Sequence, residues 1–241
     1  MRSVLMLCLL AALGPAHAQS GFSFGQAAPS DSAAQPMAWR YATLAAAHDV
    51  FEQRATRFAP NAVLSFRLPT AGAGKEGDAI DVVELVDGMR RTPLPMASST
   101  AFMLVDASAP GVARVEVNRS FAPGAMLYPH VRVRSHDLPP GVLRMGDLRL
   151  ACQAQFAMAK TEGLKAQALL EAASLLGFDA CNKLAVPLFD TPGEAFDTIV
   201  VDDGARHASL AASGAGTLTL GDKRWSDNAR IYFTMDGRAI R

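Results

Sequence analysis

The sequence is poor in cysteine and in aromatic residues, and it carries no excess charge of either sign. Three cysteines occur among its 241 residues, and aromatic residues make up 7% of the chain. Its 23 basic and 23 acidic residues balance, so charge gives no reason to expect nucleic acid or an anionic surface as a partner. Half of the residues are hydrophobic, which is enough to bury a sizeable core in one large domain or two small ones.

Apolar runs of the roughly 20 residues that a membrane-spanning helix needs are also missing. The apolar run from Val4 to Leu13 is too short, and it stands between Arg2 and Ala16-His17-Ala18. A positive start, an apolar core and an A-x-A site are typical of a secretory signal peptide. We expect residues 1–18 to be removed after Ala18 and the protein to be periplasmic or secreted, from a bacterial cell. Residues 19–35, rich in Gly, Ser, Ala and Gln, are expected to form a disordered leader.

Several short catalytic signatures are absent as well. The sequence contains no H-E-x-x-H, S-x-x-K or C-x-x-C motif, which argues against common metalloprotease, penicillin-binding and thiol-redox chemistry. Residues 72–77 (GAGKEG) have the spacing of a dinucleotide-binding loop. Such a loop must open a helix whose N-terminus meets the pyrophosphate, whereas a predicted strand follows here. We therefore expect a Gly-rich loop over residues 69–78 and no cofactor.

Cys152 and Cys181 remain once the signal peptide, which contains Cys8, is removed. An even number of cysteines in an oxidising compartment favours a disulfide. Closing a loop of this size would stabilise the fold by roughly 3–4 kcal/mol in the chain-entropy model. Two buried free thiols are the alternative.

The first predicted helix begins at Pro36 and ends at Pro60. Apolar residues recur along it at steps of three and four, which places them on one helical face. This stripe consists of Met37, Tyr41, Leu44, His48, Phe51, Ala55 and Phe58. A strand is predicted over residues 62–68 after the helix.

The segment from Asp81 to Asn118 recurs without a gap from Asp197 to Thr234, at a spacing of 116 residues. Nine of the 38 aligned positions are identical, against roughly two or three in unrelated sequence. The identical pairs are Asp81/Asp197, Asp87/Asp203, Gly88/Gly204, Arg90/Arg206, Leu94/Leu210, Leu104/Leu220, Asp106/Asp222, Ala113/Ala229 and Arg114/Arg230. The Asp-Gly pair in each copy predicts a two-residue hairpin turn, because such turns need positive φ.

The predicted fold class is α+β, with two similar units that each contain a helix, a strand and a four-stranded antiparallel β-meander. The first unit covers residues 36–118 and the second meander covers residues 185–241. A connector, residues 119–184, joins them. It is expected to hold an edge strand at His130–Ser135 and helices over residues 148–160 and 164–176. A short strand over residues 184–189 is expected to follow them. Asp147 is the predicted cap of the first of these helices.

The repeated polar residues are interpreted as determinants of the fold. A catalytic group is rarely needed twice in one chain, whereas each copy needs its own turn and strand-end ion pairs. These residues are Asp87, Gly88, Arg90, Asp106 and Arg114, with Asp203, Gly204, Arg206, Asp222 and Arg230.

A non-catalytic binding or assembly module of the bacterial envelope is the leading functional hypothesis, with another envelope protein or a cell-envelope component as its partner. The alternative is a secreted hydrolase, possibly metal-dependent, that uses His130, His136 and Asp137. A residue rise of about 3.4 Å would separate the two histidines by about 20 Å on a straight strand. A bend at Ser135 would be needed to bring them together.

Overall fold

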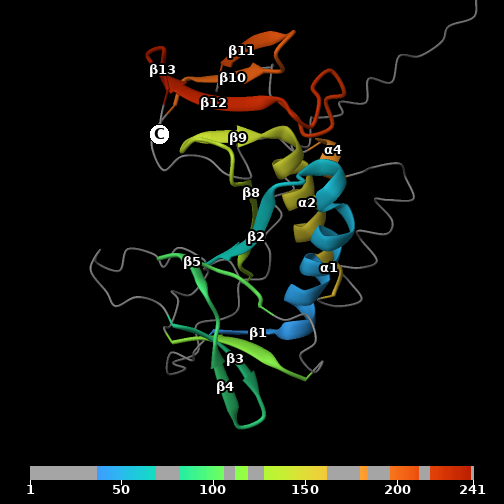
Figure 1. Ribbon diagram of the computed structural model, residues 1–241, viewed down its shortest axis with the longest axis vertical. Coiled ribbons are helices and arrows are strands. Elements are labelled where there is room, and N and C mark those ends of the chain that lie inside the picture. The colour runs from blue at the N-terminus through green and yellow to red at the C-terminus, as the bar shows by residue number, and fades with distance from the viewer. Residues whose placement is uncertain are drawn as a thin grey trace, which may run out of the picture. The chain divides into compact units, whose positions relative to one another are not determined.

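The described residues form a mixed helix and sheet structure with two long helices, one short helix and several antiparallel sheets (Figure 1). The computed structural model describes residues 37–68, 82–105, 112–118, 128–161, 180–183, 196–211 and 218–239. These residues belong to one compact unit, Ala33–Arg241. The predicted signal peptide and leader, the Gly-rich loop, the helix over residues 164–176 and the strand over residues 184–189 lie outside the described residues.

Helix α1 spans Tyr41–Phe58, and the predicted start at Pro36 is wrong. Residues Ala38–Arg40 form strand β1, which pairs with strand β7, Arg114–Val117. The chain stays extended there because β7 offers its backbone as a partner. The N–H of Tyr41 still donates to the carbonyl of Ala113 at 2.9 Å as the helix begins. The predicted end is confirmed, since the helix stops at Phe58, two residues before Pro60.

The first sheet has the strand order β1-β7-β3-β4. Strand β3, Val83–Asp87, lies between β7 and β4, Arg90–Pro93, and Gly88 in the β3–β4 turn has a φ of 59°. The predicted four-stranded meander is therefore wrong in its order, because the last strand pairs beside the first. Pro93 and Pro95 lack the N–H groups that would continue the ladder in sequence.

The second sheet contains the next two strands after β4 along the chain and has the order β5-β6-β2-β8. Strands β5, Met96–Ser98, and β6, Ala101–Phe102, extend it to β2, Ala62–Arg67. Strand β8, His130–Ser135, pairs with β2 over its whole length and lies at the sheet edge, as predicted. A strand of the predicted connector thus pairs with a strand of the predicted first unit.

The third sheet has the order β11-β10-β12-β13, and β9 also pairs with β12. It consists of β9, Val142–Arg144; β10, Thr198–Asp202; β11, His207–Ala211; β12, Arg230–Met235; and β13, Arg238–Ala239. Gly204 in the β10–β11 turn has a φ of 73°. As in the first sheet, the last strand of the predicted meander pairs beside its first strand.

The first and third sheets share their strand registers at fixed sequence spacings. Leu85 pairs with Val115 between β3 and β7, and the residues 116 positions later, Val201 and Ile231, pair between β10 and β12. The remaining pairs of these strands keep the same spacing. Strand β9 likewise pairs with β12 as β1 pairs with β7.

Helix α2 spans Met145–Lys160, and the predicted start at Leu148 with Asp147 as its cap is wrong. Its cap is Arg144, the last residue of β9, so the strand passes directly into the helix. The N–H of Met145 donates to the carbonyl of Ala229 at 2.9 Å, which corresponds to the bond at the start of α1. Asp147 lies inside the first turn, and its carboxylate binds groups outside the helix.

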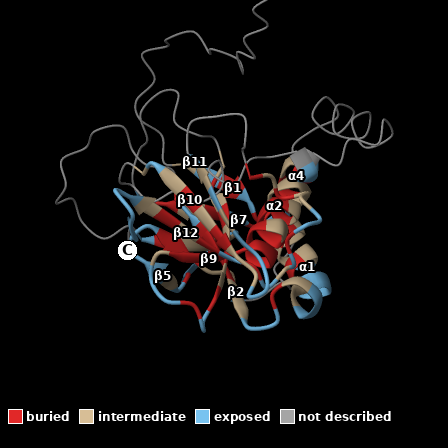
Figure 2. Cartoon of the chain, turned by 90° about the horizontal axis from the view of Figure 1, so that it is seen from above, coloured by how far each residue is buried: buried red, intermediate tan, exposed pale blue. Residues whose placement is uncertain are grey.

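Two hydrophobic cores share helix α2. Leu150, Ala154 and Met158 belong to the core that α1 and the first two sheets form. Leu148 and Cys152 belong to the core beneath the third sheet. Figure 2 shows buried residues along both α2 and the strands β9 and β12. Side chains four and three positions apart share a helical face, so one helix provides a wall to each core.

The short helix α4, Ala180–Lys183, reaches the loop before β12. The N–H of Gly221 donates to the carbonyl of Asn182 at 3.1 Å, and a side chain at Gly221 would clash with Asn182. Among the described helices, none has the length and apolar character needed to cross a membrane.

Candidate functional site

The predicted catalytic candidates lie at the two ends of strand β8. His130 begins the strand, whereas His136 and Asp137 follow its end in a turn. The N–H of His136 donates to the carbonyl of Asn61 at 3.1 Å, which holds the turn against the start of β2. The structure therefore does not bring the two histidines together. Within the described ranges, no three His, Cys, Asp or Glu side chains form a group that could hold a metal ion.

A buried polar cluster, which the sequence did not reveal, joins strands β8 and β9 to helix α2. The Asp147 carboxylate accepts hydrogen bonds from the N–H and the hydroxyl of Ser135, both at 2.8 Å. It also accepts one from Nε of Arg144 at 3.1 Å, and Nη2 of Arg144 lies 3.0 Å away without hydrogen-bond geometry. The Arg144 and Asp147 side chains are only 8% and 4% exposed.

This cluster is suited to holding elements together rather than to chemistry on a substrate. Both carboxylate oxygens of Asp147 already have donors, and the enclosed ion pair has no solvent-facing group. A signal for it existed in the sequence, since Ser135 falls on the buried side of the alternating strand that precedes the helix. The charged residue at the strand-to-helix junction, Arg144, was the missing partner.

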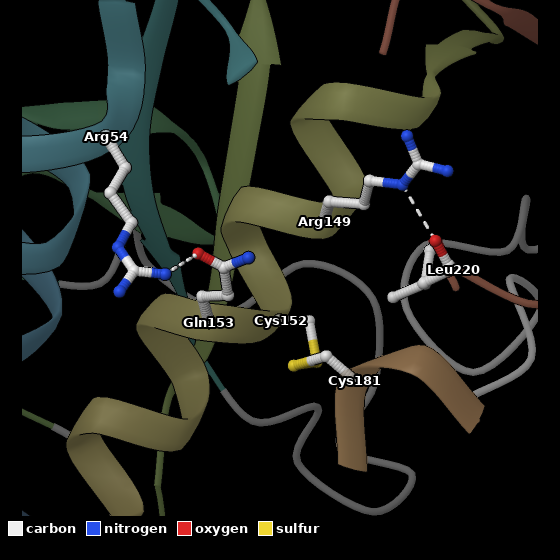
Figure 3. The surroundings of a disulfide bond; sticks show 6 residues. All are labelled: Arg54, Arg149, Cys152, Gln153, Cys181 and Leu220. Carbon is white, nitrogen blue, oxygen red and sulfur yellow. Dashed lines mark hydrogen bonds between the residues drawn. A yellow bond between two sulfur atoms is a disulfide. The ribbon is translucent and has the colours of Figure 1, made fainter. Parts of the chain in front are cut away.

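Arg149 binds the loop that precedes β12, residues 218–229, on another side of α2. Its guanidinium donates to the carbonyls of Leu220 at 2.7 Å, Asp222 at 3.0 Å and Trp225 at 3.1 Å. It also pairs with the Asp227 carboxylate at 2.5 Å. Figure 3 shows Arg149 reaching Leu220, while Gln153 one turn further along accepts a hydrogen bond from Arg54 of α1 at 2.6 Å. Four acceptors around one guanidinium fix the loop to the helix.

Several of the repeated polar residues have side-chain partners in the structure. Asp222 binds the Arg224 guanidinium at 2.7 Å, and its equivalent Asp106 lies outside the described residues. Arg206 donates to the carbonyl of Arg224 at 2.9 Å. Arg114 approaches Glu116 at 3.6 Å.

Two carboxylates in this region have lowered pKa values. Hydrogen bonds from the hydroxyl and the N–H of Ser226 lower the pKa of Asp203. Hydrogen bonding to the Arg224 guanidinium lowers the pKa of Asp222. Both interactions favour the ionised carboxylate, so they stabilise the loop at neutral pH.

Acidification should remove the contribution of Asp203 to stability. Because its folded-state pKa lies below the unfolded value, the contribution is present above the unfolded pKa and is lost as pH falls through the folded one. We expect wild type to be more stable than Asp203→Asn at pH about 7, and the difference to shrink below pH about 4. Urea unfolding at a series of pH values measures this difference. The stability difference between wild type and Ser226→Ala should shrink over the same pH range. A difference that stays constant with pH would contradict the role assigned to Asp203.

Cys152 and Cys181 lie where the predicted disulfide requires them. Their sulfur atoms are 2.08 Å apart and their Cα atoms 5.9 Å apart, within the range that a disulfide spans. Both residues are buried in the core beneath the third sheet, where Cys152 of α2 meets Cys181 of α4 (Figure 3). The structure therefore accommodates the bond.

We expect the denatured protein, once the segment containing Cys8 is removed, to show no free thiol until a reductant is added. The Cys152→Ala/Cys181→Ala variant should lose about 3–4 kcal/mol of stability, because the unfolded chain gains the freedom of an open 29-residue loop. Thiol titration in denaturant and urea unfolding measure the two effects. Two titratable thiols in the unreduced protein would refute the bond.

The outer faces of the first and third sheets differ in charge. On the first, Arg91 pairs with Glu84 at 2.9 Å and with Glu116 at 3.1 Å. The hydrogen bond to Glu84 and the charge of Glu116 raise the pKa of Arg91. Val86 pairs with Arg91 on one side and with Arg114 on the other, and it is only 5% exposed.

The corresponding positions on the third sheet carry no such network. Val200, His207 and Tyr232 stand 116 residues after Glu84, Arg91 and Glu116. Val200 and Tyr232 are directly paired across β10 and β12 and are half-buried, and His207 on β11 is exposed. We call these three residues the Tyr232 patch. Tyrosine beside aliphatic surface is a combination enriched in protein interfaces.

Comparison with protein-family models, with curated proteins and with solved structures finds no match for this chain. The functional proposal therefore rests on the residues of this chain alone. They offer an enclosed ion pair between Arg144 and Asp147 and, on the outer face of the third sheet, the Tyr232 patch.

Proposed function

We propose that this chain is an exported bacterial envelope protein that acts as a non-catalytic binding or assembly module. Its partner is another envelope protein, and the surface that binds it is the Tyr232 patch on the second β-meander region. The sequence at residues 1–18 supports export.

We further propose that the chain contains an internal duplication, in which β1, α1, β3, β4 and β7 correspond to β9, α2, β10, β11 and β12. The shared registers at a spacing of 116 residues support this proposal. So do the matching hydrogen bonds of Tyr41 and Met145 at the starts of the two helices. Two copies of one unit can keep the fold in common while one surface diverges.

The observation that carries the binding proposal is a difference between the two sheets. Where the first sheet has an ion network, the third sheet has the Tyr232 patch at the equivalent positions. On the first sheet, Arg91 pairs with both Glu84 and Glu116. Their counterparts in the second region are uncharged or weakly basic, so they cost little to desolvate when a partner covers them. A tyrosine also supplies a large rigid contact area with a polar end.

The test is affinity capture from an envelope fraction with the immobilised protein and with a variant that transplants the network. Val200→Glu/His207→Arg/Tyr232→Glu places the three residues of the first sheet at the matching positions of the third. We expect an envelope protein to be captured stoichiometrically by wild type and to be lost from the variant. The variant is expected to fold, because the introduced charges can pair as they do in the first sheet.

Met235→Glu serves as the matched control, since it adds one acidic residue at the exposed end of β12, outside the patch. It should retain the captured protein. Capture that is equal with wild type and the triple variant, or no stoichiometric capture with wild type, would overturn the proposal. Circular dichroism establishes that all three proteins are equally folded.

A further inference from the structure

We propose that the outer edge of strand β11 pairs with the same strand of a second copy of this chain, and so forms a dimer with one continuous sheet. This pairing uses the backbone edge of the third sheet, whereas the Tyr232 patch consists of side chains on its face; His207 alone belongs to both. The dimer is therefore tested by variants at Ser209 and Ala211, which lie outside the patch.

The edge has a complete set of outward backbone groups. Asp203 donates its N–H to the carbonyl of Arg206 at 2.9 Å, and the ladder alternates from this pair onward. Ala208 and Leu210 consequently face β10, whereas the N–H and C=O groups of His207, Ser209 and Ala211 point away from it. Within the described ranges, no strand pairs with this side of β11.

The corresponding edge of the first sheet is blocked. Strand β4 places Arg91 and Pro93 at the outward positions that His207 and Ser209 occupy in β11. Proline lacks the N–H that an added strand would need, and arginine on an edge repels an identical strand. The two edges have the same register in their sheets and differ in this protection, so one of them is specifically open.

The sequence of β11 fits a copy of itself. Antiparallel pairing centred on Ser209 would place His207 opposite Ala211 of the second copy, and Ala208 opposite its Leu210. The three outward residues would then exchange about six backbone hydrogen bonds. Ala208 and Leu210 are half-buried against the core beneath the third sheet, and the pairing would continue this apolar row across the junction.

Charge also favours a second copy over an unrelated strand. The five residues of β11 include no Asp, Glu, Lys or Arg, so two copies can approach without like-charge repulsion. A strand lacking charged residues has no electrostatic means of selecting a different partner. Small side chains at Ala208, Ser209 and Ala211 leave the backbone accessible.

Sedimentation of the purified protein over a series of concentrations tests this dimer. Wild type should be dimeric, and Ser209→Pro should raise the dimer dissociation constant by at least about tenfold, because it removes the outward N–H at the centre. Ser209→Thr keeps that N–H and should remain dimeric. Since the N–H of Ser209 does not join the ladder with β10, the proline variant should keep the circular dichroism of wild type.

A second variant keeps the test decisive if the proline disturbs folding. Ala211→Lys places a charge on the edge and should also weaken the dimer, without any change to the backbone. A wild type that is monomeric at every concentration would overturn the proposal, as would a dimer that both variants leave intact. Loss of envelope capture together with an intact Ser209-dependent dimer would reject the proposed function alone.

Discussion

Replacing Asp147 with alanine is expected to destabilise the protein by about 3–5 kcal/mol. The variant leaves the Arg144 guanidinium enclosed, at 8% side-chain exposure, without its carboxylate. It also removes the acceptor for the N–H and the hydroxyl of Ser135. An enclosed charge without a partner costs far more than the pair contributes. Urea unfolding followed by tryptophan fluorescence measures the loss.

Asp137→Ala is the matched control, because this carboxylate lies exposed in the turn only two residues after Ser135. Its effect should remain within about 0.5 kcal/mol. The double variant Arg144→Met/Asp147→Leu removes both charges of the pair. It should therefore lose less stability than the sum of the losses measured for Arg144→Met alone and Asp147→Leu alone. Equal losses for Asp147→Ala and Asp137→Ala would show that the enclosed pair is not formed.

Gly146→Ala is expected to cost about 3 kcal/mol or more, at or beyond the upper end for overpacked sites. A Cβ atom at Gly146 would lie 2.0 Å from the carbonyl oxygen of Phe58 and 2.9 Å from that of Asp227. Both neighbours are backbone atoms, so relief requires moving the end of α1 or the loop before β12. The N–H of Gly146 also donates to the Asp227 carbonyl at 2.9 Å. Urea unfolding again provides the measurement.

Ala42→Ser is the control for Gly146, because Ala42 is the second residue of α1 as Gly146 is the second residue of α2. Ala42 is exposed, so an added hydroxyl should change stability by no more than about 0.5 kcal/mol. Wild-type stability in Gly146→Ala would mean that the two helices and the loop do not approach as closely as described.

Local signals in the sequence predicted much of the secondary structure. Gly88 and Gly204 have positive φ in two hairpin turns, as predicted. Each turn consists of the glycine and the residue after it rather than of the Asp-Gly pair, because Asp87 pairs with Arg90 and Asp203 with Arg206. Strands β2 and β8 lie where the sequence predicted them, and for β8 the signal was the alternation of its residues. These elements depend on neighbouring residues, whose spacing is visible in one dimension.

Strand order was not predictable in the same way. The strand after β4 was expected beside it, but β7 pairs with β3 and the hairpin of β5 and β6 joins another sheet. Which partner a strand selects depends on contacts far apart in sequence, and Pro93 and Pro95 indicate only where the chain leaves the first sheet. The starts of both helices were predicted wrongly for the same reason. The residues before each helix form strands, β1 and β9, because they pair with β7 and β12, which are distant in sequence.

Contacts between side chains were likewise predictable only in part. Cys152 and Cys181 were identified as a pair because cysteines are few and their number is even. The role of Arg149 could not be predicted from the sequence, because its four acceptors come from residues 220–227, more than 70 positions away. His130 and His136 were close in sequence and lie at opposite ends of a strand. Sequence proximity was misleading there because an extended chain separates residues quickly.

The sharing of α2 between two cores has a consequence for how the molecule comes apart. Trp39 is buried in one core and Trp225 in the other, so each reports on its own region. If α2 unfolds, both cores lose the side chains that this helix contributes to them. We therefore expect single-tryptophan variants, Trp39→Phe and Trp225→Phe, to report coincident transitions in urea. Two separate transitions would mean that the regions unfold independently, and that α2 remains folded with one of them.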